Sequence, residues 1–158
     1  MDLSAINPVL LIASLMVAAT PLLLAAIGET VVEKAGVLNL GVEGMMIIGA
    51  IAGFATAVES GSPLLGFVAA AIAGAALSVL FALLTQFAQA NQVASGLSLT
   101  LFGLGLSALM GQSYVGVKPP QMGKLDIPVL SDLPVVGPIL FGHDLMLYFG
   151  IALTAAIW

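Results

Sequence analysis

Long apolar runs separated by short polar stretches dominate the chain. Leu3–Gly28 holds 26 residues without a charge, and Ser60–Val117 holds 58. A helix rises about 1.5 Å per residue, so about 20 apolar residues cross a hydrocarbon core of about 30 Å. The first run is therefore long enough for one crossing, and the second for two crossings joined by a turn.

This pattern predicts an all-α integral membrane protein with about five transmembrane helices. Polar turns are expected at 28–36, at Glu59–Pro63 and at 88–92, and a long loop is expected at 113–142, where five of the eight prolines fall. The helices between these breaks are predicted at 8–27, 37–58, 64–87 and 93–110, with a fifth that begins after His143-Asp144.

The second predicted helix contains a charge that needs an explanation. Only the fifteen residues Gly44–Val58 separate Glu43 from the next charge, and they rise about 22 Å. A helix that crosses here must also include Val37–Val42, which places Glu43 within the membrane or at its edge. Ionisable groups at that depth usually face a bundle interior or a water-filled path. Glu43 is therefore the leading candidate for a functional residue.

Glycine weakens the helix around this charge. Broken helices at membrane depth are tolerated where they line a cavity or pack on protein. We predict a break near Asn39–Gly44, with Asn39 placed to cap the helix that follows. The glycines assigned to the break are Gly36, Gly41 and Gly44.

Small residues four positions apart predict close contacts between helices, because they let two backbones approach each other. One pair lies in the second predicted helix and a stripe of three lies in the fourth. These residues are Gly49 and Gly53, and Gly103, Ser107 and Gly111.

Composition supports the membrane class and excludes several others. Hydrophobic residues make up 61% of the chain and charged residues 7%, and the mean hydropathy is +1.20. The chain has no cysteine and no arginine, so it shows neither thiolate metal ligands nor a basic surface for nucleic acid. His143-Asp144 supplies too few ligands for a metal site. No nucleophile–base pair or phosphate-binding loop is present, so we predict no catalysis, no metal and no cofactor.

The apolar run Leu145–Trp158 has fourteen residues, too few to cross a bilayer. From this we expect that the sequence is a fragment truncated at its C-terminus, inside a helix.

Three segments resemble one family. They are Ala-Thr-Pro-Leu-Leu-Leu-Ala-Ala at 19–26, Glu-Lys-Ala-Gly-Val-Leu-Asn-Leu-Gly-Val-Glu-Gly-Met-Met-Ile-Ile-Gly-Ala at 33–50, and Ala-Asn-Gln-Val-Ala-Ser-Gly-Leu at 90–97. Together they resemble permease subunits of nucleoside importers of the ATP-binding-cassette class, which are related to ribose and branched-chain amino-acid permeases. Residues 129–142 also resemble the family's external loop.

The resemblance implies a single permease domain over 1–158 in a bacterial or archaeal plasma membrane. It implies four partners: the lipid bilayer, a second homologous permease, cytoplasmic ATP-binding subunits that hydrolyse ATP, and an extracytoplasmic substrate-binding protein. It also places the turns at 28–36 and 88–92 on the cytoplasmic side. Two features depart from the family: no segment matches the cytoplasmic loop that docks on the ATPase, and Gln89 stands where an arginine is usual.

Asn39, Glu43 and Asn91 are the residues expected near the translocation path or its cytoplasmic gate, because amides and carboxylates pair with nucleoside hydroxyls and ring nitrogens. The alternative for Glu43 is structural: it binds free amides of the broken helix or pairs with Lys34. Two other functions stay open at this point. One is a secondary transporter or small channel in which Glu43 carries protons, and the other is a structural subunit without a path.

Overall fold

The computed structural model describes residues 7–123 and 139–157, and the statements below concern these residues. Contacts divide the chain into two compact units, which are described separately. One contains residues 1–28 and 122–158, and the other contains residues 29–121. Half of the predicted proline-rich loop at 113–142, and most of the family-like segment at 129–142, lie outside the described residues.

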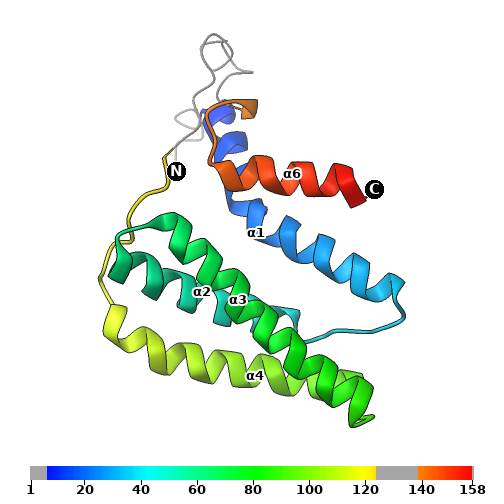
Figure 1. Cartoon of the computed structure of the whole chain (residues 1–158). Coiled ribbons are helices and arrows are strands. Elements are labelled where there is room, and N and C mark those ends of the chain that lie inside the picture. The colour runs from blue at the N-terminus through cyan, green and yellow to red at the C-terminus, as the bar shows by residue number, and fades with distance from the viewer. Residues whose placement is uncertain (1–6, 124–138, 158) are drawn as a thin grey trace, which may run out of the picture. The chain divides into compact units, whose positions relative to one another are not determined.

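The described residues are helical and contain no strand, which confirms the predicted all-α class (Figure 1). In chain order the elements are α1 Pro8–Lys34, α2 Val42–Ser60, α3 Pro63–Ala82, the π-helix η2 Leu83–Phe87, α4 Gln92–Gly111, the 3₁₀-helix η3 Gln112–Tyr114, and α6 Leu145–Ile157. Four helical stretches in the described part of the chain are long and apolar enough to cross a membrane: 8–34, 42–60, 63–87 and 92–114. The fifth expected helix is α6, which has 13 residues and is shorter than a span.

The first helix ends later than predicted. α1 continues through the polar residues that follow Gly28 and stops at Lys34, so the predicted turn at 28–36 is wrong over most of its length. Gly36 ends the helix with a φ of +83°. Its amide bonds the Glu33 carbonyl at 2.9 Å, and the Val37 amide bonds the Val32 carbonyl at 3.2 Å. This pair of bonds is a Schellman motif, which favours glycine because of the left-handed backbone.

The second helix begins later than predicted. α2 starts at Val42, so the expectation that Val37–Val42 extends the helix is wrong for residues 37–41. Its 19 residues rise about 28 Å and include both Glu43 and Glu59. The non-helical stretch is residues 35–41, which lies before the helix and not within it. Gly41 is the N-cap and no side chain caps the helix, so the predicted cap by Asn39 is not formed.

α2 is the central helix of the 29–121 unit. A third of its most hydropathic 18-residue window is buried, against 6% to 17% in the other three spans. α3 packs on it in the antiparallel sense and α4 in the parallel sense (Figure 1). The core between these helices consists of Met45, Ile48, Leu77, Phe81 and Leu99.

In the other unit, α6 packs on α1 near Leu23 and Leu24. A Cβ on Gly150 would make ordinary contacts with Leu23 Cδ2 at 3.4 Å and Leu24 Cδ2 at 3.6 Å, which places Gly150 beside these two residues of α1. The Thr154 hydroxyl donates to the Gly150 carbonyl at 2.8 Å, which satisfies a polar group within an apolar helix.

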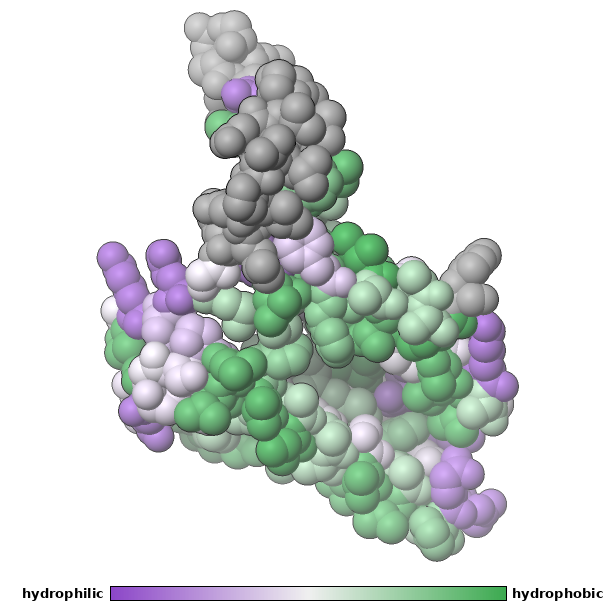
Figure 2. Space-filling view, turned by 45° about the horizontal axis from the view of Figure 1, so that its top comes forward, coloured by the Kyte–Doolittle hydropathy of each residue, from purple (hydrophilic) through white to green (hydrophobic). Residues whose placement is uncertain are grey.

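Hydrophobic side chains cover most of the surface that Figure 2 shows. Leu101, Leu109 and Phe87 are among the most exposed, at 70%, 69% and 80%. A helix that is apolar on all sides is typical of a membrane span, in which the outward face meets lipid or another helix.

Candidate functional site

The connection between α1 and α2 is held by side chains from two helices. Leu38 donates its backbone amide to Gln92 Oε1 at 2.8 Å, and the next amide, that of Asn39, donates to Glu29 Oε1 at 3.2 Å. Glu29 belongs to α1 and Gln92 to the first turn of α4. Two consecutive amides of a non-helical segment therefore find side-chain acceptors on two helices that are far apart in the sequence.

The Asn39 side chain makes hydrogen bonds within the connection between α1 and α2. Its side chain is 6% exposed, and Oδ1 accepts the Gly41 amide at 3.0 Å. The Nδ2 group contacts Met45 Sδ at 3.6 Å. This is an Asx turn that satisfies the last amide before α2. Both polar ends of the Asn39 side chain are committed, so a solute would have to displace an internal hydrogen bond to reach either one.

Glu43 lies in the first turn of α2 and is exposed. Its position at the helix N-terminus is favourable, because the helix dipole stabilises a negative charge there. In the described part of the chain neither structural alternative for this residue is seen: the carboxylate has no ion pair with Lys34 and no hydrogen bond to the amides of residues 35–41. Of the three predicted site residues, Glu43 is the one whose side chain makes no hydrogen bond within the described residues.

Asn91 is the N-cap of α4. Its Oδ1 accepts the Ala94 amide at 3.0 Å, and its backbone is extended. Its side chain is thus bound to its own helix. The next residue, Gln92, is the one that reaches the α1–α2 connection, so α2 and α4 start side by side and the neighbourhoods of Asn39 and Asn91 are linked.

Small residues bring α4 close to α2 where the two helices start. A Cβ on Gly44 would lie 2.6 Å from the Leu99 carbonyl oxygen, and one on Gly96 would lie 2.8 Å from the Gly41 nitrogen. The Thr100 hydroxyl donates to the Leu40 carbonyl at 3.1 Å across the same contact. Gly44, assigned to the helix break, thus lies inside α2 at its closest contact with α4.

The small-residue pair of α2, Gly49 and Gly53, packs against α3. A Cβ on Gly53 would lie 2.8 Å from the Gly66 carbonyl oxygen, and one on Gly49 would lie 3.1 Å from that of Ala70. Gly111, at the far end of the α4 stripe, would make only an ordinary 3.7 Å contact with the Ile51 side chain.

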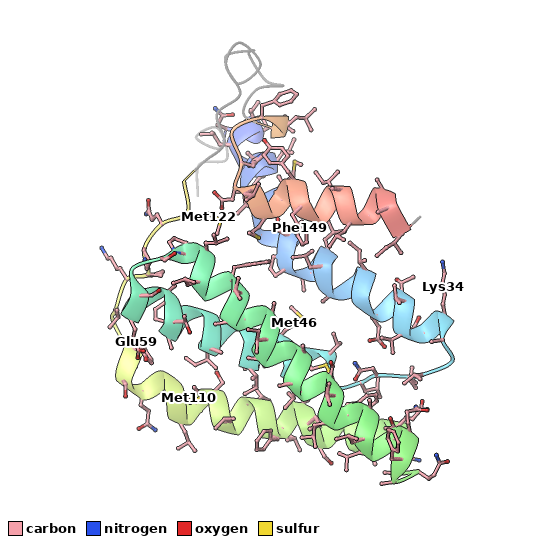
Figure 3. The ribbon with its side chains drawn as sticks, viewed as in Figure 1. Lys34, Met46, Glu59, Met110, Met122 and Phe149 are labelled. Carbon is pink, nitrogen blue, oxygen red and sulfur yellow. The ribbon has the colours of Figure 1, made fainter. Side chains whose placement is uncertain are left out.

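At the opposite end of α2, Tyr114 joins α2 to the end of the α4 stretch. Its hydroxyl donates to Glu59, and its ring meets Phe54 edge-on with centroids 5.9 Å apart. Figure 3 shows Glu59 and Met110 at this same end of the two helices. The α4 stretch is therefore bonded at one end to the connection before α2, through Gln92, and at the other to the end of α2, through Tyr114.

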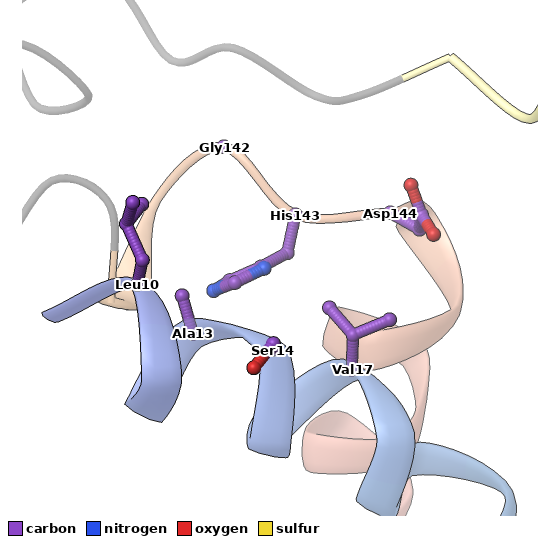
Figure 4. A pocket seen from close by; sticks show the side chains of 7 residues that line it. All are labelled: Leu10, Ala13, Ser14, Val17, Gly142, His143 and Asp144. Carbon is purple, nitrogen blue, oxygen red and sulfur yellow. The ribbon is translucent and has the colours of Figure 1, made fainter. Parts of the chain in front are cut away.

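The other unit contains a pocket of about 350 Å³ under His143. It is lined by Leu10, Ala13, Ser14, Val17, Gly142, His143 and Asp144. His143 is 5% exposed, and its Nε2 lies 2.7 Å from the Ile139 carbonyl oxygen. Figure 4 shows its ring reaching from the loop toward α1. The described residues hold no group of three metal-ligating side chains, here or elsewhere.

Sequence reasoning missed Glu29 and Gln92, which it treated as turn residues. Nothing in their composition indicates that Glu29 bonds the amide ten positions later, or that Gln92 bonds an amide 54 positions earlier. It also missed Gly66 and Gly96. Gly96 lies seven positions before Gly103, a spacing that marks the same helix face.

Apolar spans, small-residue contacts and a polar junction between helix ends together define a multi-pass membrane protein. A comparison with known families identifies it further: residues 11–158 match the family described as the branched-chain amino acid transport system / permease component. The chain belongs to this permease family.

Similar proteins are transporter permeases. The chain is 39% identical over 145 residues to the ABC transporter permease protein TsgC13 of Haloferax volcanii, whose proposed solute is glucose; the match covers 89% of this chain and 44% of TsgC13. It is 34% identical over 152 residues to the guanosine ABC transporter permease protein NupQ of Bacillus subtilis; this match covers 89% of this chain and 47% of NupQ. It is 32% identical over 143 residues to the nucleoside ABC transporter permease protein NupC of Lactococcus lactis; this match covers 84% of this chain and 45% of NupC.

The chain thus spans somewhat less than half the length of these curated relatives. No solved structure matches it significantly.

Proposed function

We propose that the chain is part of the permease of an ATP-driven importer that carries nucleosides. The observation that carries this proposal is the family match over residues 11–158, together with two relatives named for guanosine and nucleosides. Four membrane-capable helical stretches and the close α2–α3 and α2–α4 contacts fit a protein that builds a path through the bilayer.

A second solute class follows from other relatives. TsgB13 of Haloferax volcanii, a glucose ABC transporter permease protein, is 33% identical over 132 residues, covering 78% of this chain and 33% of TsgB13. Simple sugars are therefore the second candidate. Nucleosides and sugars share a ring that bears hydroxyl groups, which is the chemistry common to both proposals.

The proposed assembly follows the family. A second homologous permease would complete the path, cytoplasmic subunits would bind and hydrolyse ATP, and an extracytoplasmic protein would deliver the solute. The chain itself would carry out no ATP hydrolysis. In this arrangement Glu43 lies beside the path or its cytoplasmic gate, and Asn39 and Asn91 hold the starts of α2 and α4 next to it.

The test is uptake by the complete transporter. The genes for the full permease and for its neighbouring ATPase and binding protein are expressed together, and the complex is reconstituted in proteoliposomes with ATP inside or outside. Labelled guanosine should accumulate only when ATP reaches the ATPase subunits, and uptake should survive collapse of the membrane potential. Accumulation of glucose alone would select the second candidate. Uptake that needs a potential and no ATP would show a secondary transporter instead.

A further inference from the structure

One carboxylate oxygen in the 29–121 unit is buried without a hydrogen-bond donor. Glu29 uses Oε1 to accept the Asn39 amide at 3.2 Å, while its Oε2 is buried and has no partner among the described residues. Leaving a buried polar atom unpaired costs free energy, and such atoms are rare enough in folded proteins to require an explanation.

The position of Glu29 makes the unpaired oxygen more unusual. Glu29 is the first charged residue after the charge-free run that forms most of α1, and it lies 21 residues after Pro8, about 32 Å along the helix. If the hydrocarbon core of about 30 Å begins near Pro8, Glu29 lies close to its far edge. Ionisable groups within membrane spans are rare and often mark transport paths.

Three neighbouring donors are already used. Asn39 gives its amide to Glu29 Oε1 and its Nδ2 to Met45, and the Leu38 amide is taken by Gln92. Lys34, on the same helix, is exposed and makes no ion pair with Glu29 in the described structure. None of these groups is the donor for Oε2.

We propose that this donor is a hydroxyl group of the transported solute, and that Glu29 is a solute-binding residue. The inference rests on the proposed function. A hydroxyl bound to a carboxylate makes a short, charge-assisted hydrogen bond, and hydroxyls are what nucleosides and sugars share. Oε2 is buried in this structure, so the solute reaches it when the residues that cover it move aside.

The substitution Glu29→Gln distinguishes the roles of the two carboxylate oxygens. Glutamine keeps a carbonyl oxygen that accepts a hydrogen bond from the Asn39 amide, and it replaces the second oxygen by an NH₂ group that cannot accept a hydrogen bond from a hydroxyl. Glu33→Gln is the matched control, because Glu33 lies one turn later in α1 and is exposed. Both variants are made in the complete transporter with its partner subunits.

The measurement is the KM and maximal rate of uptake for guanosine and for its 2′-, 3′- and 5′-deoxy analogues. The wild-type transporter should prefer guanosine over one of these analogues by about tenfold or more, as expected for a hydrogen bond to a charged group. Glu29→Gln should raise the KM for guanosine to that of this analogue and leave the KM of the analogue nearly unchanged. Glu33→Gln should keep the wild-type preference.

Other outcomes overturn the inference in different ways. If Glu29→Gln changes uptake of all four solutes equally, the partner of Oε2 is a water molecule or another protein segment. If the preference for guanosine persists in Glu29→Gln, the residue does not contact the solute, while the proposed function stands. If the wild-type complex shows no ATP-driven uptake, the proposed function and this inference both fail. Should Glu29→Gln not assemble, Glu29→Asp withdraws the carboxylate by one methylene and should reduce the same preference.

Discussion

Gly44 and Gly103 face each other across the contact between α2 and α4. A Cβ on Gly103 would lie 2.8 Å from the Gly44 carbonyl oxygen and 2.9 Å from the Gly44 Cα. These neighbours are backbone atoms, so a side chain here could be accommodated only if the two helices moved apart. The pair therefore sets the separation of α2 and α4.

Gly103→Ala should destabilise the protein because it forces these helices apart. Overpacked sites cost about 1–3 kcal/mol. The expected result is a lower melting temperature of the detergent-solubilised transporter. Gly105→Ala is the matched control on the same helix, where a Cβ would meet nothing within 4 Å. Alanine favours the helix there, so its melting temperature should stay equal or rise. Equal effects of the two substitutions would show that the α2–α4 distance is not set at Gly103.

Asn39→Ala should destabilise the connection between α1 and α2. It removes the acceptor of the Gly41 amide, and an unpaired buried amide costs about 1–3 kcal/mol. Asn39→Asp keeps an acceptor for that amide but loses the Nδ2 contact with Met45 and buries a charge, so it tests the rest of the side chain. Thermal unfolding and guanosine uptake are measured together. A changed KM with an unchanged melting temperature would assign Asn39 to the solute path and not to the connection.

Asn91 should behave as a helix cap. Asn91→Ala removes the acceptor for the Ala94 amide and should cost about 1 kcal/mol of stability. Asn91→Asp and Asn91→Ser keep an N-cap oxygen and should retain both stability and uptake. If Asn91→Ser is stable yet loses uptake, the amide itself contacts the solute or a partner.

Glu43→Gln tests the exposed carboxylate at the start of α2. If Glu43 lies beside the path, removing its charge should lower the uptake rate severalfold while the melting temperature changes little, because the side chain makes no hydrogen bond within the described structure. Glu59→Gln, at the other end of the same helix, is the control, since glutamine retains an acceptor for Tyr114. Unchanged uptake by Glu43→Gln in the full complex would remove Glu43 from the path.

Much of the fold followed from the order of apolar and polar residues. Predicted helices at 64–87 and 93–110 agree with the helical stretches at 63–87 and 92–114 within a few residues, because Pro63 and the polar turn at 88–92 mark their limits. The end of α1 and the start of α2 were misplaced. The sequence shows polarity at 28–36, but polar residues continue a helix as readily as they end one, and here Gly36 decides where it stops.

The candidate site shows the same division. Sequence alone determined that this is an all-α membrane protein of a permease family, that Glu43 stands at the edge of a span, and that Gly49, Gly53 and Gly103 lie on helix-packing faces. Only the tertiary structure decided which groups meet. Glu29 and Gln92 accept hydrogen bonds from two consecutive amides, and Tyr114 donates one to Glu59. The second carboxylate oxygen of Glu29 has no donor among the described residues. Periodicity along a helix fixes which side chains share a face. It carries no information about which distant segment supplies their partners, because that depends on how the helices pack.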